Sequence, residues 1–332
     1  MQRAAAVFLQ GGRTMNRLAV LTSGGDAPGM NAAVRAVVRC AGYYGMEVFG
    51  VEQGYDGLID GAFRKLEARD VGSIIQRGGT MLRTARSERF LTEEGRAAAL
   101  EQCVQRGVEG LVVIGGDGSF RGAWELHRLG LAVVGVPGTI DNDVNGTDMT
   151  IGFDTALNTA LDAVRRLRDT AHSHDRLFIV EVMGRHSGYI ALRTAVAGGA
   201  EQVVIPELPF NLDTLCRKLQ LSCLSGKRFS VIIVAEGAIS GYELKEQLKA
   251  RGYDSTVTVL GHIQRGGAPT SYDATLASRM GAYAVDCLRS GKRGVMTGIV
   301  NGIMTPVPLV FTWERKKRPN AELIELVEML SI

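Results

Sequence analysis

Residues 112–120 read VVIGGDGSF, an apolar run that ends in a turn of three glycines around a single carboxylate. A short apolar run bounded by turn residues is typical of a central strand in a parallel sheet, which is buried on both faces. Similar runs at Leu18–Leu21, Glu47–Val51 and Val133–Val136 predict neighbouring strands of the same sheet.

Helix-period apolar spacing lies between several of these runs, at Asn31–Ala41 and Glu93–Arg106, and returns at Asp154–Arg168. Strands that alternate with helices predict an α/β fold with a mostly parallel sheet. The chain of 332 residues exceeds the usual limit of about 250–300 residues for one core. We therefore expect two α/β domains, the second containing strands at Leu177–Val182, Val203–Ile205, Val231–Ala235 and Val257–Leu260.

Charge and composition argue against several classes of protein. The net charge is +3, and the strongest basic run, RKKR at Arg315–Arg318, is too short for a nucleic-acid-binding arm and is interpreted as a solvated surface. No apolar stretch reaches the roughly 18 residues that a membrane span needs. The five cysteines are scattered without a CxxC pair, which favours a reducing compartment such as the cytoplasm.

Ligands on open α/β sheets collect beyond the carboxyl ends of the strands, where this chain has three glycine-rich loops. The first, TSGGDAPGMN at Thr22–Asn31, opens a helix whose N-terminus favours anions, although a strand-to-helix turn also needs glycine for its geometry. In the second, GGDGS, Asp117 suits Mg²⁺, which takes its other ligands from water and substrate phosphates. The alternative is a tight turn in which Ser119 caps a helix.

The third loop, PGTIDND, places two carboxylates, Asp141 and Asp143, two residues apart. One could accept a proton while the other orients it or completes a metal site. An ordinary Asp/Asn turn is the alternative. No GxxxxGK[ST] sequence occurs, so a P-loop nucleotide site is not expected.

Five motifs in order, TSGGDAPGMN, GGDGS, PGTIDND, EVMGRHSG and GHIQRGG, resemble those of the 6-phosphofructokinase family from Arg17 to Arg318. The resemblance implies two doubly wound, mostly parallel α/β domains interleaved by the chain, with the active site in the cleft between them. Bacterial members are homotetramers. The expected division is an extension at residues 1–16, an ATP-binding domain at 17–152 plus 264–315, and a fructose 6-phosphate domain at 153–263 plus 316–332.

The resemblance also implies site residues and a mechanism in which MgATP phosphorylates the 1-hydroxyl of fructose 6-phosphate. Asp141 is the expected base, Arg185 and Arg86 neutralise charge, Thr139 holds the transferring group, and Asp117 binds Mg²⁺. The expected ATP contacts are Gly25, Tyr55, Arg86, Gly116, Asp117, Gly118 and Ser119. The expected sugar phosphate contacts are Thr139, Asp141, Asp143, Met183, Gly184, Arg185, Glu236, His262 and Arg265, with Arg176 reaching in from a neighbouring subunit.

Pyrophosphate-using relatives typically carry Asp where Gly118 stands and Lys where Gly138 stands, so two glycines favour ATP as the donor. A pyrophosphate-dependent or mixed-donor enzyme remains an alternative, as does a catalytically silent subunit. Thr256 stands where the family usually has an arginine for the sugar phosphate, which predicts weaker affinity unless Arg251 compensates.

Several residues match the family's effector site, which binds a nucleotide or phosphoenolpyruvate. Ala68 and Ser225 replace basic residues of that site, so we expect weakened or altered allostery. Ordinary surface arginines are the alternative interpretation. The matching residues are Arg35, Arg39, Arg168, Glu201 and Lys227.

Overall fold

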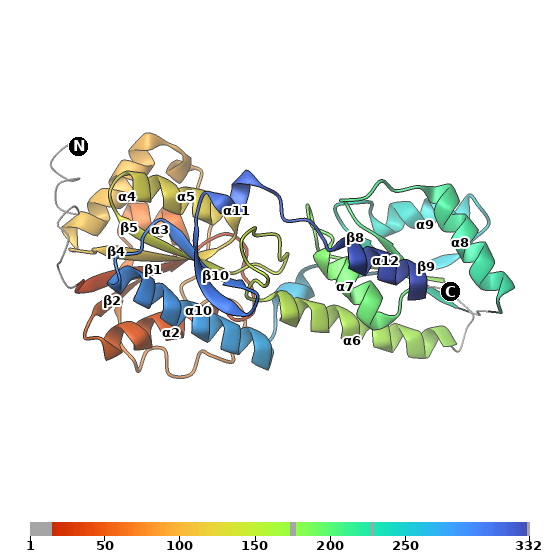
Figure 1. The fold of residues 1–332 in the computed structure, drawn as a ribbon, viewed down its shortest axis with the longest axis horizontal. Coiled ribbons are helices and arrows are strands. Elements are labelled where there is room, and N and C mark those ends of the chain that lie inside the picture. Colours follow the sequence, from red (N-terminus) through yellow and green to blue (C-terminus); the bar gives the residue numbers. More distant parts are fainter. Residues whose placement is uncertain (1–14, 173–176, 227–228, 331–332) are drawn as a thin grey trace. The chain divides into compact units, whose positions relative to one another are not determined.

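The computed structural model describes residues 15–172, 177–226 and 229–330 (Figure 1). The predicted extension at residues 1–16 lies outside them except for its last two residues, and Asn16 accepts a hydrogen bond from the backbone of Glu47. Arg176 and Lys227 also lie outside the described residues.

The chain forms two compact units, and it enters each of them more than once. Unit 1 contains the residues up to Ile140, Val144–Phe153 and Arg265–Lys317, and unit 2 contains the rest. Asp141–Asp143 group with unit 2, although the chain on both sides of them belongs to unit 1. The predicted division into an ATP-binding and a fructose 6-phosphate domain stays a prediction.

Unit 1 is built on a seven-stranded sheet whose central strands are parallel and whose two edge strands, β3 and β11, are antiparallel to their neighbours. The buried strands are the apolar runs expected from the sequence, and β4 is buried at every residue. In spatial order the strands are β11 (Ile303–Pro308), β10 (Val295–Val300), β5 (Ala132–Pro137), β4 (Gly110–Gly115), β1 (Arg17–Thr22), β2 (Glu47–Val51) and β3 (Phe63–Leu66).

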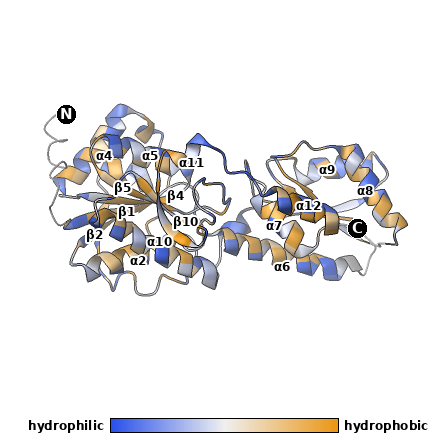
Figure 2. Ribbon diagram, in the orientation of Figure 1, coloured by the Kyte–Doolittle hydropathy of each residue, from blue (hydrophilic) through white to orange (hydrophobic). Residues whose placement is uncertain are grey.

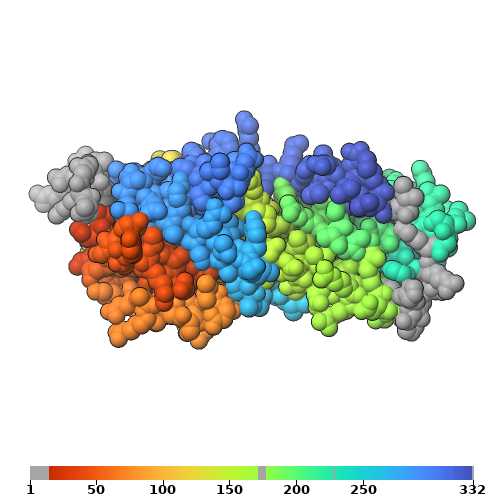
Figure 3. Space-filling model, turned by 60° about the horizontal axis from the view of Figure 1, so that its bottom comes forward, coloured from red at the N-terminus to blue at the C-terminus, as the bar shows by residue number. Residues whose placement is uncertain are grey.

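Helices cover both faces of this sheet (Figure 1). On one face α2 (Met30–Tyr43) packs against α10 (Ser271–Arg289), and the two approach so closely that a Cβ on Gly281 would lie 2.6 Å from the backbone oxygen of Ala33. Figure 3 shows these two segments side by side, α2 in red and α10 in blue. The other helices of unit 1 are α3 (Gly54–Asp60), α4 (Glu93–Gln105), α5 (Asp117–Arg128), α11 (Phe311–Glu314) and the short 3-10 helix η1 (Arg89–Leu91).

Unit 2 is built on four parallel strands around a smaller core of aliphatic residues. Figure 2 shows the hydrophobic residues concentrated on the strands and on the helix sides that face them. In spatial order the strands are β7 (Gln202–Val204), β8 (Ser230–Ala235), β6 (Leu177–Val182) and β9 (Ser255–Val259). The helices are α6 (Phe153–His172), α7 (Tyr189–Gly198), α8 (Leu212–Leu224), α9 (Gly241–Lys249) and α12 (Ala321–Leu330), and the 3-10 helix η2 (Gly261–Arg265) follows β9.

The expected α/β class with mostly parallel sheets is confirmed. Each strand and helix expected from the sequence is present, and its observed ends lie within four residues of the expected ends. No described helix is long and apolar enough to cross a membrane. All five cysteines are described and free, and the Arg315–Arg318 run is exposed except for the half-buried Lys317.

Candidate active site

The GGDGS turn joins β4 directly to α5, and its first glycine, Gly115, is packed tightly against neighbouring atoms. A Cβ on Gly115 would lie 2.5 Å from Ser119 Oγ and 2.6 Å from the backbone oxygen of Ser23, so only glycine fits there. Ser119 is buried, and Gly116 occupies the N-cap of α5 without any side-chain cap. The alternative in which Ser119 caps this helix is therefore wrong.

The outer side of the same turn is open. Nothing lies within 4 Å of the position that a Cβ on Gly118 would take, and the nearest atom to such a Cβ on Gly116 is Thr139 Cβ at 3.9 Å. Asp117 is exposed and makes no hydrogen bond or ion pair with the described residues. A phosphate chain could lie against this bare backbone beside a free carboxylate.

This carboxylate suits a cation that takes most of its ligands from elsewhere. The described residues contain no group of three or more His, Cys, Asp or Glu side chains that could hold a metal ion by themselves. Mg²⁺ usually binds through one or two carboxylates together with waters and substrate phosphates. Asp117 lies beside the open backbone of Gly118 and fits that pattern.

Tyr55 supports the turn from within the core. Its ring is buried and stacks on Phe90, with ring centroids 4.0 Å apart, and its hydroxyl donates to the backbone oxygen of Ser119 at 2.5 Å. Burial raises the pKa of Tyr55, so the phenol stays protonated and can donate. The predicted contact between Tyr55 and ATP stays a prediction, whereas its support of the turn is direct.

The first glycine-rich loop lies beside the second, because the backbone of Ser23 donates to Ile114 at the end of β4. Gly24 has φ +86°, a conformation that favours glycine, and its carbonyl accepts from Thr84 at 2.7 Å. Arg265 covers this loop: its Nη1 donates to the Asp26 oxygen at 3.0 Å, and a Cβ on Gly25 would lie 2.2 Å from it. The structure thus brings a residue expected to bind ATP against one expected to bind the sugar phosphate.

Arg86 lies in the loop that contains Thr84, two residues further along the chain. Its side chain is exposed and, within the part of the chain that the structure describes, forms no hydrogen bond or ion pair. The loop itself is held, because Thr22 Oγ1 at the end of β1 donates to the Arg83 oxygen at 2.8 Å. Arg86 is therefore a cation on an anchored loop, with no charged partner among the described residues.

The third loop begins in unit 1 with tight packing. The backbone of Gly138 donates to Gly115 at 3.0 Å, and a Cβ on Gly138 would lie 3.1 Å from both Ile114 and Met30. Thr139 is held by its neighbours, since its N–H donates to Ile151 and its carbonyl accepts from Thr150 at 2.6 Å. The Cβ of a lysine at position 138 would require the side chains of Ile114 and Met30 to shift by a few tenths of an ångström.

In unit 2 several predicted residues follow the carboxyl ends of adjacent parallel strands. Val182 of β6 pairs with Ala235 of β8, so the segment Met183–Arg185 and Glu236 leave the sheet at the same edge. The end of β9 joins them through the bond from the Leu260 N–H to Glu181, which places His262 shortly after that edge. Arg185, Glu236 and His262 are all exposed there.

The turn that carries Arg185 has strict steric demands. Gly184 has φ +143°, and a Cβ on it would lie 2.2 Å from the backbone oxygen of Ser187. A Cβ on Gly237 would lie 1.9 Å from the backbone oxygen of Arg185. These two glycines let the loops after β6 and β8 approach each other, and sequence motifs alone flagged only Gly184.

Asp141 and Asp143 are half-buried and flank Asn142, which is buried and has φ +51°. Asn tolerates this left-handed conformation better than most residues. Ser187 Oγ donates to the Asp141 backbone oxygen at 2.8 Å. Ser187 could not be singled out from the sequence, because a serine inside EVMGRHSG has no signature of its own.

Two residues concern the predicted loss of affinity for the sugar phosphate. Thr256 is the second residue of β9 and pairs with Phe178 near the start of β6. Its effect on that affinity stays a prediction. Arg251 forms an exposed ion pair with Asp213 at the start of α8, and its suggested compensation also stays a prediction.

The effector candidates fall into both units. In unit 1 Arg35 and Arg39 lie on α2, and Arg39 donates to the Ala68 oxygen at 3.5 Å. In unit 2 Arg168 donates to the Gly199 oxygen, and Glu201 accepts from the Val231 N–H at 2.6 Å. Their use as an effector site stays a prediction.

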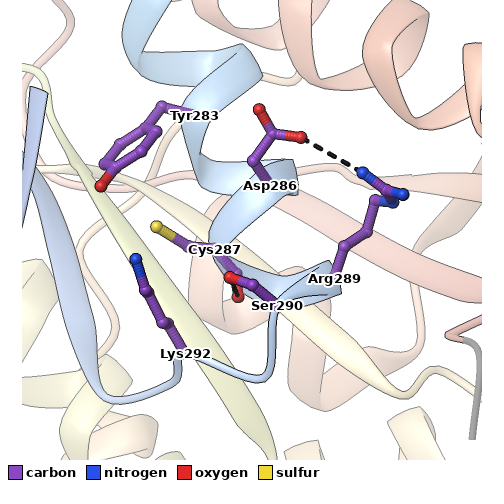
Figure 4. Close-up of a pocket in the computed structure, with 6 residues that line it drawn as sticks. All are labelled: Tyr283, Asp286, Cys287, Arg289, Ser290 and Lys292. Atoms are coloured by element: carbon purple, nitrogen blue, oxygen red, sulfur yellow. Dashed lines mark hydrogen bonds and ion pairs between the residues drawn. The ribbon is translucent and has the colours of Figure 1, made fainter.

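A cavity of about 320 Å³ lies at the C-terminal end of α10, and none of its lining residues is predicted for the active site (Figure 4). Two of its lining residues, Asp286 and Arg289, form an ion pair at 3.5 Å. Burial raises the pKa of the Cys287 thiol, which points inward. The remaining lining residues are Tyr283, Ser290 and Lys292.

Comparison with known proteins gives one consistent answer. A model of the family described as Phosphofructokinase matches residues 17–288. The ATP-dependent 6-phosphofructokinase of Halalkalibacterium halodurans is 54% identical over 319 residues, which is 96% of this chain and 100% of that protein. ATP-dependent 6-phosphofructokinase 1 of Thermus thermophilus is 54% identical over 325 residues, with the same coverage.

Solved structures agree with the sequence comparison. Phosphofructokinase of Pichia pastoris in the T-state superposes with a TM-score of 0.87 at 37% identity, covering 92% of this chain and 38% of that one. A pyrophosphate-dependent phosphofructokinase of Marinobacter aquaeolei has a TM-score of 0.80 at 24% identity over 95% of this chain and 91% of its own, which shows the shared fold alone. By fold, motifs and near full-length identity, this chain belongs to the phosphofructokinase family.

Proposed function

We propose that this protein is an ATP-dependent 6-phosphofructokinase, which transfers the γ-phosphate of ATP to the 1-hydroxyl of fructose 6-phosphate and yields ADP and fructose 1,6-bisphosphate. The observation that carries the proposal is the 54% identity along the whole length of relatives with that name. The residues expected to act in the transfer, including Asp117, Asp141 and Arg185, are all intact in this chain.

In the proposed mechanism the substrates are positioned and their charge is neutralised for an in-line transfer. Asp141 would accept the proton of the 1-hydroxyl as the new bond to phosphorus forms. Arg185 and Arg86 would stabilise the negative charge on the transferring group, and Thr139 would help to hold it. The exposed guanidinium of Arg86 and the exposed turn at Arg185 support these roles.

We propose Mg²⁺ as the divalent cation, held by Asp117 together with phosphate oxygens and water. The free carboxylate of Asp117 beside the open backbone of Gly118 supports this assignment. Bound Mg²⁺ would supply positive charge to the phosphates of ATP.

The donor follows from the two glycines that distinguish ATP from pyrophosphate. The open space at Gly118 leaves room for the phosphates of a nucleotide, and the packing around Gly138 opposes a lysine side chain. Two alternatives to ATP dependence are tested: that the enzyme uses pyrophosphate, and that the protein is a catalytically silent subunit.

We propose further that the protein acts in the cytoplasm as a homotetramer, in which Arg176 contacts the sugar phosphate of a neighbouring subunit. An effector site would bind a nucleotide or phosphoenolpyruvate, with weakened or altered allosteric control of the enzyme. Its proposed residues are Arg35, Arg39, Arg168, Glu201 and Lys227. The buried Nε of Arg168, which has no hydrogen-bond partner among the described residues, is compatible with such an anion.

An assay coupled to aldolase tests the function. The purified protein is supplied with fructose 6-phosphate and either MgATP or magnesium pyrophosphate, and fructose 1,6-bisphosphate and ADP are measured. We expect turnover with MgATP at least 100 times faster than with pyrophosphate. This ratio corresponds to a difference of a few kcal/mol in the activation free energy. Equal or faster turnover with pyrophosphate contradicts the proposed donor, and no turnover with either contradicts enzymatic function.

A further inference from the structure

The Asp141–Asn142–Asp143 turn has a residue in the left-handed conformation at its centre. Asn142 is buried and adopts φ +51°, which costs free energy for a residue with a side chain unless its surroundings hold it. The peptide between Asp141 and Asn142 is part of this turn, so its orientation helps to set the backbone from which the Asp141 side chain leaves.

Ser187 contacts that same peptide from another part of the chain. Its buried hydroxyl donates to the Asp141 carbonyl oxygen at 2.8 Å across 46 residues of sequence. A hydroxyl on a buried residue has few alternative partners, so such a bond restricts the peptide more than a fully exposed one does. Ser187 thus restricts the peptide between Asp141 and Asn142, the residue with positive φ.

Ser187 is itself held by the first residue of α7 and, through it, by the C-terminal segment. The Tyr189 N–H lies 3.5 Å from Ser187 Oγ, and the Tyr189 hydroxyl donates to the Arg318 oxygen at 2.5 Å. Tyr189 is buried, and its pKa is raised to about 12, so the phenol remains a donor at neutral pH. Figure 1 shows α12, which follows Arg318, beside α7, and the two helices are in contact.

A neighbouring carboxylate fixes the start of α7. Glu207 Oε1 accepts from the Gly188 N–H at 2.8 Å, and a Cβ on Gly188 would lie 2.4 Å from Ile205. The segment that carries Ser187 is thereby anchored at the two residues that follow the serine. It forms a rigid support rather than a free loop.

From these contacts we infer that Ser187 is a positioning residue for the phosphoryl transfer: it orients Asp141 through the Asp141–Asn142 peptide, and Tyr189 ties it to the C-terminal segment. The inference rests on the proposed function, in which Asp141 is the base. Ser187 does not touch a reacting atom. Its loss should lower the rate of transfer without weakening the nucleotide site, whose predicted residues belong to unit 1.

The test compares Ser187→Ala with the wild type in the coupled assay. Ser187→Ala should lower kcat about tenfold, the effect of one lost buried hydrogen bond, with KM for MgATP changed less than twofold. Ser187→Thr keeps a hydroxyl and should restore at least part of kcat. The matched control is Ser290→Ala, because Ser290 also donates to a backbone oxygen, at 3.1 Å, but lies exposed at the end of α10. It should leave kcat unchanged.

A double-mutant cycle separates positioning from general support of the fold. If Ser187 acts through Asp141, then Ser187→Ala should cost less than twofold in a protein that already carries Asp141→Asn. A full tenfold loss in that background, or a wild-type kcat in Ser187→Ala alone, would overturn the inference while the proposed function stands. A wild type that does not phosphorylate fructose 6-phosphate would overturn both.

Circular dichroism melting accompanies each assay. If Ser187→Ala does not fold, Tyr189→Phe carries the same test, because it removes only the hydroxyl that reaches Arg318. Tyr189→Phe should then lower kcat twofold to fivefold with KM for MgATP unchanged, and this loss should vanish beside Asp141→Asn. An unchanged kcat in folded Tyr189→Phe would count against the role of the C-terminal segment.

Discussion

At the residue scale, Gly118 offers the sharpest test of the phosphoryl donor. Its Cβ position is empty, so Gly118→Asp should fold normally and place a negative charge where the phosphates of ATP are proposed to bind. We expect KM for MgATP to rise at least tenfold, because two like charges at close range repel. Steady-state kinetics with varied MgATP measure this change.

Gly42→Asp is the matched control for that experiment, since Gly42 is equally open but lies in α2. The control should retain the wild-type KM for MgATP. If both variants, or neither, show a raised KM, the charge at position 118 does not act on ATP.

Thr256 allows a gain-of-function prediction. Thr256→Arg restores a charge that the family usually provides, and a charge-assisted contact with phosphate contributes about 1.5–3 kcal/mol. KM for fructose 6-phosphate should fall about tenfold, with KM for MgATP unchanged. Thr258→Arg on the same strand is the control and should not lower KM. A Thr256→Arg variant with the wild-type KM would contradict the assignment of this position to the sugar phosphate.

At the scale of elements, the link between α3 and α5 is the bond from Tyr55 to Ser119. Tyr55→Phe keeps the stacking on Phe90 but removes the donor to the turn. Loss of one buried hydrogen bond should lower the free energy of unfolding by about 1–2 kcal/mol and loosen the start of α5. Chemical denaturation and KM for MgATP measure the two effects, and we expect KM to rise about threefold. An unchanged stability would show that the bond contributes nothing to this junction.

The packing of α4 makes stability depend on pH through Cys103. Burial of this side chain raises the pKa of its thiol from 9.0 to about 12. Because the folded state binds the proton more tightly, this contribution is complete below about pH 9 and is lost as the pH rises toward about 12. Cys103→Ala should therefore show a smaller loss of stability over that range than the wild type.

Cys223→Ala is the control, because Cys223 is exposed at the end of α8. Thermal melts from pH 8 to pH 11 compare the three proteins. If the wild type and Cys103→Ala lose stability in parallel, the thiol is not the titrating group.

At the scale of the whole molecule, most of the buried strands could be predicted from their apolar runs. The edge strands β3 and β11 and the buried strand β10 were missed, because polar residues, proline or glycine interrupt their apolar runs. The grouping of Asp141–Asp143 with unit 2 could not be seen in the sequence, because a three-residue excursion leaves no change in composition.

Site residues with unusual chemistry were easier to predict than residues that support them. Asp117 and Arg185 stand out among glycines, whereas Ser187 and Gly237 matter only through contacts with segments distant in sequence. No periodicity or motif encodes a hydroxyl that bonds a backbone oxygen 46 residues away. Such partners require coordinates.

The most direct test of the central claim is the rate at which the purified protein forms ADP and fructose 1,6-bisphosphate from MgATP and fructose 6-phosphate, measured for the wild type and for Asp141→Asn. The account predicts rapid turnover by the wild type and a kcat lowered by about 10²–10⁴ in the variant, the usual contribution of a general base. Full activity of Asp141→Asn would contradict it.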